Sequence, residues 1–202
     1  GRLFAGAKVF QESFSVTRNF EYESPMTLGF GMNVGAEYWL DYYNFETKLN
    51  THGTNTTYED GGNDTPDSAQ NRFVLSFMAG ADVLNIWQRL EHHGLVLGAG
   101  FRLGQYPIKE DNQSGSAMGG LVSYKYFGEP TYLALNFYSY GSAGSLVEFA
   151  ADYHWRDDLD LSFAIYRQQT VVQNSDAESR FFENGIWGAA VWDLDRLLGG
   201  AP

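Results

Sequence analysis

The stretch from Met26 to Tyr42 alternates large apolar side chains with small or polar ones over its whole length. One set comprises Leu28, Phe30, Met32, Val34, Ala36, Tyr38, Leu40 and Tyr42; the other comprises Thr27, Gly29, Gly31, Asn33, Gly35, Glu37, Trp39 and Asp41. Strict alternation is the periodicity of a β-strand. The run far exceeds the about 5–6 residues usual in soluble strands, and a tilted strand needs only about 9–11 residues to cross a bilayer. We therefore predict a membrane-spanning strand whose small, polar face lines a crowded interior.

The same alternation returns along the rest of the chain. Apolar residues occupy every second position over 73–83, 95–103, 122–126, 133–137, 147–155 and 159–165. Two less regular segments, Leu3–Phe14 and Glu183–Leu194, are expected to be the first and last strands, although which of their faces points outward is open. The expected fold class is all-β: a closed antiparallel transmembrane barrel of about ten strands, with eight or twelve as alternatives. We expect it to form a single domain over residues 1–202.

Composition restricts how this chain can cross a membrane and what it can bind. Although 44% of the residues are hydrophobic, no apolar run reaches the about 18 residues of a membrane helix. Backbone groups in hydrocarbon must be paired within the protein, so such a chain can span a bilayer only as a closed barrel. The net charge of −12 argues against nucleic acid and against adsorption to an anionic surface. The lipid bilayer is the expected partner, and no cofactor is expected.

The connections between the predicted strands fall into two sets, as they do in barrels that join their strands by short turns on one side and longer loops on the other. Turns are predicted at Asp41–Asn44, Leu84–His93, Gly128–Thr131 and Arg156–Asp158, and loops at Thr17–Ser24, Thr51–Asn71, Lys109–Ser116, Gly141–Gly144 and Gln173–Arg180. The Leu84–His93 connection is long enough to hold a helical turn. Ten strands satisfy the alternation, with both chain ends on the side of the turns.

Aromatic residues gather near the predicted turns. Those expected to form a girdle at the membrane interface are Tyr38, Tyr42, Trp87, Tyr126, Tyr153, Trp155 and Trp192. Tyr and Trp favour that interface because their rings are apolar and their tips are polar. Aromatic residues are also common in strands of any kind. Here, however, they lie next to turns that are predicted without reference to them.

Taken together, the Gly-interrupted alternating strands, the Leu95–Arg102 segment LVLGAGFR and the aromatic placement resemble Gram-negative outer-membrane β-barrel proteins in general. No specific family is indicated. The resemblance covers nearly the whole chain and implies a location in the bacterial outer membrane and a porin-like architecture. One departure is that the sequence runs on past Trp192 to Pro202, whereas such chains commonly finish on a strand with a terminal aromatic residue. This implies either a short periplasmic tail or a chain that is part of something longer.

Inward positions of the predicted strands carry charges of both signs. They are Lys8, Glu37, Arg72, Asp82, Arg102, Lys125, Glu148, Asp152 and His154. A barrel of ten strands is only slightly wider than the barrels of eight strands whose interiors are filled by side chains. We therefore expect these charges to pair with one another and to plug the lumen, in preference to lining a narrow selective pore.

The Thr51–Asn71 loop holds the densest group of carboxylates outside the lumen. Glu59, Asp60, Asp64 and Asp67 lie there, close to His52, and form a candidate site for a cation or a protein partner. The group lacks the ordered spacing of a metal site, so we read the segment as an acidic loop and assign no metal. His92 and His93 are adjacent, and His154 stands near two aspartates, but no nucleophile is spaced around them. We therefore expect no enzymatic activity.

The sequence leaves four functional interpretations. The preferred one is a non-enzymatic structural or anchoring component of the outer membrane that presents acidic external loops to a partner. The first alternative is a narrow pore for ions or small solutes. The others are a soluble lipocalin-like barrel with its large residues inside, and an outer-membrane hydrolase, which would require His52 or His154.

Overall fold

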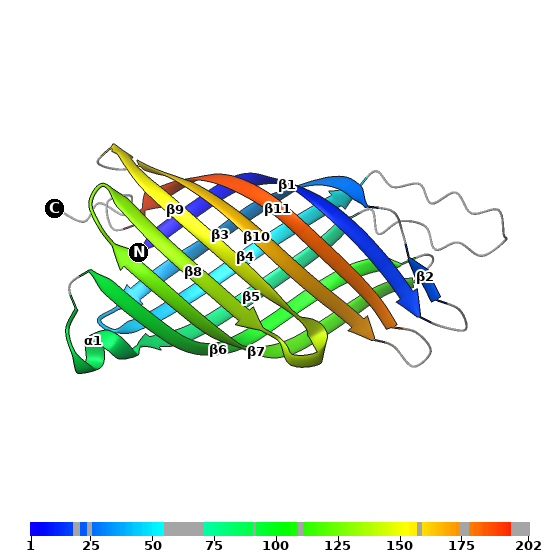
Figure 1. Cartoon of the computed structure of the whole chain (residues 1–202), viewed down its shortest axis with the longest axis horizontal. Coiled ribbons are helices and arrows are strands. Elements are labelled where there is room, and N and C mark those ends of the chain that lie inside the picture. Colours follow the sequence, from blue (N-terminus) through cyan, green and yellow to red (C-terminus); the bar gives the residue numbers. More distant parts are fainter. Residues whose placement is uncertain are drawn as a thin grey trace.

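The computed structural model describes residues 1–17, 21–23, 26–54, 71–90, 92–108, 111–156, 159–173 and 178–194 and folds them into one barrel (Figure 1). Its wall is built of long strands: β1 (Arg2–Thr17), β3 (Thr27–Leu40), β4 (Tyr43–Thr54), β5 (Asn71–Asp82), β6 (His93–Ile108), β7 (Asp111–Phe127), β8 (Thr131–Ser139), β9 (Gly144–Arg156), β10 (Leu159–Gln173) and β11 (Glu178–Asp193). Three short elements lie between them: β2 (Glu21–Glu23), α1 (Val83–Trp87) and η1 (Gly141–Ala143). Among the described residues, no helix is both long and apolar enough to cross a membrane.

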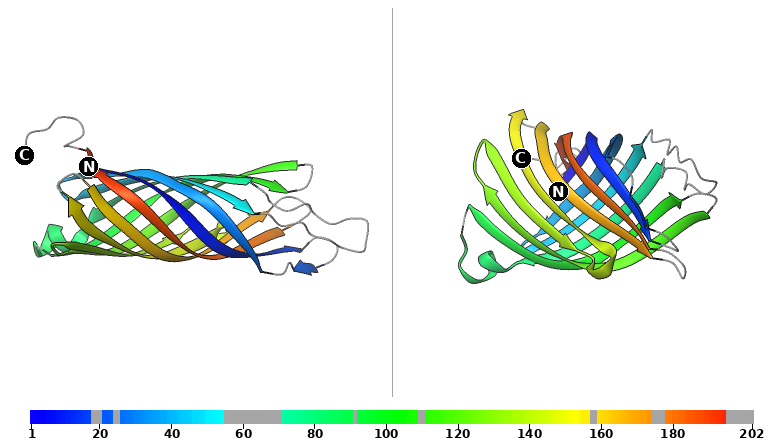
Figure 2. Two further views of the ribbon diagram at one scale, coloured as in Figure 1. Left: turned by 90° about the horizontal axis from the view of Figure 1, so that it is seen from above. Right: turned by 45° about the vertical axis from the view of Figure 1, so that its right-hand side comes forward.

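The strands close into a ring. Each long strand pairs antiparallel with the long strand that follows it, in the order β11-β10-β9-β8-β7-β6-β5-β4-β3-β1. β11 also pairs with β1 along its whole length, from Arg2↔Asp193 to Thr17↔Glu178, which completes the barrel (Figure 2). The prediction of a closed antiparallel barrel of ten strands is confirmed.

The barrel has two ends, which we call the turn end and the loop end. The turn end holds the connections β3–β4, β5–β6, β7–β8 and β9–β10, and β1 begins and β11 ends there (Figure 1). The Leu194 amide donates a hydrogen bond of 2.7 Å to the Gly1 carbonyl at this end. The loop end holds the connections β1–β3, β4–β5, β6–β7, β8–β9 and β10–β11.

The structure shortens one predicted connection and places a helical turn at another. The loop expected over Lys109–Ser116 is too long, because β7 begins at Asp111 and pairs with β6 as far as Ile108↔Asp111. Its Ser and Gly residues hide a strand from any search for apolar alternation, since the backbone ladder does not require large side chains. The Leu84–His93 connection holds α1, whose start is capped by Asp82 accepting from the Asn85 amide at 3.2 Å.

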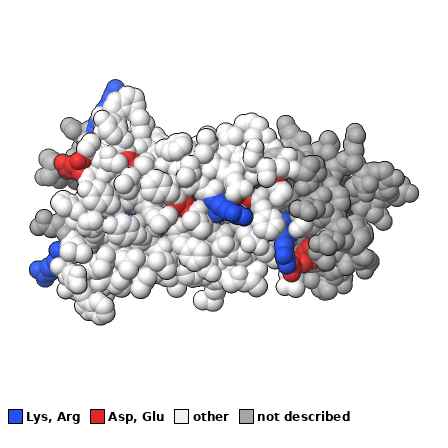
Figure 3. Space-filling model, viewed as in Figure 1, with Lys and Arg blue, Asp and Glu red and all other residues white. Residues whose placement is uncertain are grey.

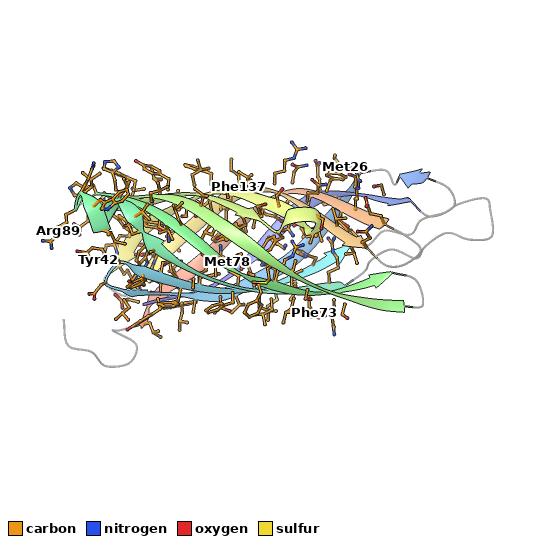
Figure 4. All side chains as sticks on the ribbon, turned by 90° about the horizontal axis from the view of Figure 1, so that it is seen from below. Met26, Tyr42, Phe73, Met78, Arg89 and Phe137 are labelled. Carbon is orange, nitrogen blue, oxygen red and sulfur yellow. The ribbon has the colours of Figure 1, made fainter. Side chains whose placement is uncertain are left out.

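Large apolar side chains cover the outside of the barrel. Leu28, Phe30 and Met32 are 54–59% exposed, whereas the inward residues of the same strands are mostly buried. Figure 4 shows side chains projecting outward along both edges of the barrel in that view, with Phe73 and Phe137 on its outer surface. The described strands therefore have their apolar faces outward, the reverse of the lipocalin-like alternative. A continuous apolar exterior of this kind is suited to lipid.

Glycines on the inward face allow side chains to cross the lumen close to the wall. A Cβ added at Gly31 would collide with the Thr51 carbonyl of β4 and lie 2.7 Å from Cε of Lys8. One added at Gly29 would meet the ring of Phe10. Small residues are thus required at these places because the interior is already filled.

We expect Gly31→Ala to lower the free energy of unfolding by about 1–3 kcal/mol, the usual cost of forcing extra atoms into a packed interior. Gly120→Ala is the matched control, because a Cβ there meets nothing closer than 3.7 Å, the Gly98 carbonyl. Denaturant unfolding of both variants in the same lipid vesicles measures the difference. Equal unfolding midpoints would contradict the account of a tightly filled lumen.

Candidate functional site in the barrel lumen

The lumen contains three groups of buried polar side chains, which follow one another from the turn end to the loop end. The turn-end group is centred on Arg2, Glu37, Lys125 and Asp152. The central group is formed by Glu46, Lys48 and Glu148. The loop-end group is formed by Lys8, Glu12, His52, Arg72 and Glu183. Each group combines both signs of charge.

Glu37 of β3 organises one half of the turn-end group. Its Oε1 accepts from Lys125 of β7, from Asn44 Nδ2 at 2.8 Å and from Trp39 Nε1 at 3.2 Å. Its Oε2 lies 3.9 Å from Arg2 Nη1. The Lys125 ammonium also lies 4.7 Å from the centre of the Trp39 ring. The carboxylate is therefore surrounded by donors, as a buried charge requires.

Arg2 of β1 organises the other half. Its Nη2 donates to Asp152 Oδ2 at 2.6 Å and lies 3.4 Å from Asp160 Oδ2. Ser162 also donates to Asp152, and the guanidinium lies 5.0 Å from the centre of the Tyr132 ring. These contacts tie β1 to β9 and β10 near the turn end.

The central group joins opposite walls of the barrel. Lys48 Nζ of β4 donates to Glu148 Oε1 of β9 at 3.2 Å, and it lies 3.4 Å from Glu46 Oε1. In the ring, β5 to β8 separate β4 from β9 on one side, and β3, β1, β11 and β10 on the other. Tyr138 of β8 accepts from Lys48 at 3.1 Å and donates to Glu46 at 2.8 Å. The contact between Lys48 and Glu148 therefore spans the full width of the lumen.

Neutral donors complete the surroundings of Glu148. Asn136 Nδ2 donates to its Oε1 at 3.0 Å and Trp187 Nε1 to its Oε2 at 2.9 Å. Ser123 in turn donates to Asn136 Oδ1 at 2.5 Å. The buried carboxylate is thus held by a connected network, which fixes its position against the β4 wall.

Glu183 of β11 is the hub of the loop-end group. Its Oε1 accepts from Lys8 Nζ at 3.2 Å and from the Tyr166 hydroxyl, and its Oε2 lies 3.6 Å from Arg72 Nη2. Arg72 of β5 also donates to Glu12 of β1. The Arg72 guanidinium, 4.6 Å from the centre of the Phe181 ring, crosses the lumen between strands that are not neighbours.

His52 completes the loop-end group but lacks a hydrogen bond on either ring nitrogen. Its side chain is only 3% exposed, and Nε2 lies 3.6 Å from Glu183 Oε2, too far for a hydrogen bond. The ring of Phe10 meets it edge-on with 5.6 Å between centres. The expectation that His52 accompanies the acidic loop is wrong, because β4 carries it inside the lumen.

The remaining lumen residues predicted from the sequence have different surroundings. Asp82 caps α1 and accepts from the Leu95 amide at 3.1 Å. Arg102 donates to the Ala143 carbonyl at 2.5 Å. His154 lies at the turn-end rim with its side chain 52% exposed, and its Nδ1 is 2.8 Å from Asp160 Oδ1. The structure thus brings Lys8, Glu37, Arg72, Lys125, Glu148 and Asp152 into the three groups and leaves Asp82, Arg102 and His154 outside them.

The described part of the barrel has cavities within the lumen and at both of its ends. One of about 50 Å³ lies between the turn-end and central groups. A second, of about 340 Å³, lies at the turn-end rim beside Asp152, His154 and Asp160. A third, of about 190 Å³, lies at the loop end beside Arg102, η1 and the strand tips of β7 and β10. The wall is low there, because β7 pairs with β8 only from Gly120↔Ser139 onward.

The predicted aromatic residues lie on the outer surface toward the turn end. Tyr38, Tyr42, Tyr126, Tyr153 and Trp155 are exposed, and Trp87 of α1 is 87% exposed. Trp192 is half-buried on β11, opposite Leu3 of β1 and Leu159 of β10. Their shared position is that of an interfacial girdle.

Glu59, Asp60, Asp64 and Asp67, the candidate cation or partner site, lie outside the described residues. Within the part of the chain that the structure describes, no three His, Asp or Glu side chains gather closely enough to hold a metal ion.

Comparison with known proteins gives structural matches only. No protein-family model matches the sequence, and no curated protein matches it either. The outer-membrane protease OmpT from Escherichia coli has a similar structure, with a TM-score of 0.53 and 9% identity over 95% of this chain and 96% of that one. The COG4313 outer-membrane channel from Pseudomonas putida F1 gives a TM-score of 0.46 and 12% identity over 94% and 95% of the two chains.

At this level of identity the OmpT match establishes the fold alone. The closed barrel, the apolar exterior and the polar lumen define the chain as an integral β-barrel of the Gram-negative outer-membrane class. The same features locate it in the bacterial outer membrane, with lipid against its apolar surface.

Proposed function

We propose that this chain is a non-conducting, non-enzymatic barrel that serves as a structural or anchoring component of the outer membrane. The observation that carries the proposal is the contact between Lys48 and Glu148, which joins opposite walls in the middle of the lumen. A pore would need a continuous water-filled path. Here the turn-end and loop-end groups place further pairs of charges across the lumen on either side of that contact.

The three groups also act as braces. Breaking a buried pair by removing one partner costs about 3–5 kcal/mol, because the remaining charge is left without compensation. An interior held in this way favours rigidity over transport.

The partner-facing surface in this proposal is the acidic β4–β5 connection with Glu59, Asp60, Asp64 and Asp67, which leaves β4 and enters β5 at the loop end. Its charge favours a cationic partner.

Conductance in planar bilayers tests the proposal directly. Wild-type protein is expected to give no discrete steps, and the variant with Glu46, Lys48 and Glu148 all replaced by Ala is expected to stay closed too, because the turn-end and loop-end groups still cross the lumen. The Gly120→Ala variant, altered only on the outer surface, serves as the control and should stay silent. Discrete, ion-selective steps from wild-type protein would overturn the plugged-barrel proposal.

A narrow pore is the second candidate, and the cavities at the two ends of the lumen favour it. In that case the three groups would have to leave a continuous path between the two cavities, and wild-type protein would itself conduct. A hydrolase of the kind named by the OmpT match has weaker support. The exposed His154 and Asp160 pair beside the turn-end cavity is a candidate acid or base for it. Loss of a hydrolytic activity in His154→Gln would be needed to establish it.

A further inference from the structure

The outer surface of the barrel carries one charge that lipid alone does not explain. Arg167 of β10 is exposed and faces outward, between Ile165 and Gln169 on the same face. Among the described outward-facing strand residues it is the one charged side chain away from the strand tips; Glu178 and Arg180 pair with each other at the tip of β11. Arg167 has no carboxylate partner within the described part of the chain. The face in Figure 3 is mostly uncharged between its two ends, with one blue group and a few small red patches.

Arg167 belongs to a polar row that crosses three strands. Gln11 of β1 stands directly opposite Asn184 of β11, which stands directly opposite Arg167. Side chains directly opposite each other on one face have Cβ atoms about 4.5–5.5 Å apart. Two amide side chains and a guanidinium therefore form one continuous patch on the outside of the barrel, here called the polar row.

The polar row marks the loop-end border of the apolar surface on this side. The equivalent row one step toward the turn end consists of Val9, Ile186 and Ile165. The next row toward the loop end consists of Ser13, Phe182 and Gln169, of which only Phe182 is apolar. The polar row thus lies where hydrocarbon gives way to lipid headgroups.

The energetics of this depth favour a ligand for Arg167. An outward Arg costs about 2–4 kcal/mol at the bilayer midplane but only about 0–1 kcal/mol near the interface, where a long side chain can extend its charge to the headgroups. A guanidinium presents its donors in a fork that matches two oxygens of one phosphate. The amides of Gln11 and Asn184 add further donors within the same patch.

We propose that Gln11, Asn184 and Arg167 form a binding site for the phosphate of a lipid headgroup in the leaflet at the loop end. The acyl chains of that lipid lie along Val9, Ile186 and Ile165, so one amphipathic molecule satisfies both the polar row and the apolar surface beside it. This site is independent of the lumen and goes beyond the proposed anchoring function.

The test uses the folded full chain in nonionic detergent, with lipid binding followed by native mass spectrometry. The probes are lipid A and the same lipid with its phosphates removed. Arg167→Gln is expected to lower the affinity for lipid A about tenfold or more, the effect of losing a hydrogen bond to a charged group. Arg167→Lys, which keeps the charge without the fork, should fall between the two, and Arg180→Gln is the matched control and should bind as wild type does.

Three results would overturn the proposal. One is equal binding of lipid A by wild type and Arg167→Gln, with folding of both verified by heat-modifiable gel migration. Another is equal binding of the lipid with and without phosphates, or of inorganic phosphate as tightly as lipid A. The third is a wild-type dimer that Arg167→Gln abolishes while lipid binding is unchanged, which would assign the row to a second copy of the chain.

Discussion

Replacing Lys48 by Met is expected to lower the free energy of unfolding by about 3–5 kcal/mol. Lys48 is the only cation of the central group, and its Nζ lies 3.4 Å from Glu46 and 3.2 Å from Glu148, all of them buried. Without it, two buried carboxylates lose their nearest counter-charge, and their repulsion is weakly screened. Denaturant unfolding of the protein in lipid vesicles, followed by tryptophan fluorescence, measures the loss.

Two comparison variants make that result specific. Arg180→Met removes an exposed cation paired with Glu178, so its expected cost is below about 1 kcal/mol. Combining Lys48→Met with Glu46→Gln and Glu148→Gln removes the charges together and should recover most of the loss, because no uncompensated charge remains. If Lys48→Met and Arg180→Met unfold at the same denaturant concentration, the central group does not brace the barrel.

The fold could be predicted from the sequence because lipid acts on every second residue. Within 26–42, 73–83 and 95–103 the outward positions must be apolar, so the pattern also shows which face of each strand points to lipid and which points to the lumen. Lys125 and Glu148 could be assigned to the lumen by the same parity. Predicting that they are buried requires no knowledge of the partner strand.

The partners themselves could not be predicted. Lys48 and Glu148 are 100 residues apart in the chain, and they meet only because β4 and β9 stand opposite each other. That relation depends on the number of strands and on their stagger around the ring, which the alternation within one strand does not contain. Glu46 and Lys48 alternate with Phe45, Thr47 and Leu49, so the signal for their inward position is present in the sequence, although weak.

The loop-end residues His52 and Glu183 escape prediction for a different reason. The sequence predicts a loop that begins at Thr51 and so places His52 beside the acidic residues, whereas β4 continues to Thr54. Glu183 stands in the last strand, where Asn184, Gly185 and Gly188 interrupt the apolar pattern and leave the outward face ambiguous. Its position becomes clear only once β11 pairs with β1, through Glu12↔Glu183.

Leu135→Arg is expected to lower the free energy of unfolding by about 2–4 kcal/mol, the cost of an outward Arg near the bilayer midplane. Leu135 faces outward in the middle of β8, next to Phe149 of β9 and Tyr124 of β7, which are exposed on the same surface. Arg cannot gain a partner there, because its neighbours are apolar or aromatic. Unfolding in vesicles of one lipid composition gives the measurement.

Ser116→Arg is the matched control, because Ser116 is exposed on β7 on the loop-end side of Met118, and its expected cost is about 0–1 kcal/mol. Equal costs for Leu135→Arg and Ser116→Arg would mean that lipid does not cover β8 at this depth. If the polar row lies at headgroup level, the native Arg167 should cost the fold as little free energy as the Arg introduced by Ser116→Arg. Its replacement by Leu should then leave stability in phosphate-free detergent unchanged or raised, while lipid A should stabilise wild type more than the Leu variant. Replacing Arg167 is thus expected to weaken lipid A binding without lowering stability in phosphate-free detergent, which a purely structural role for its charge would not produce.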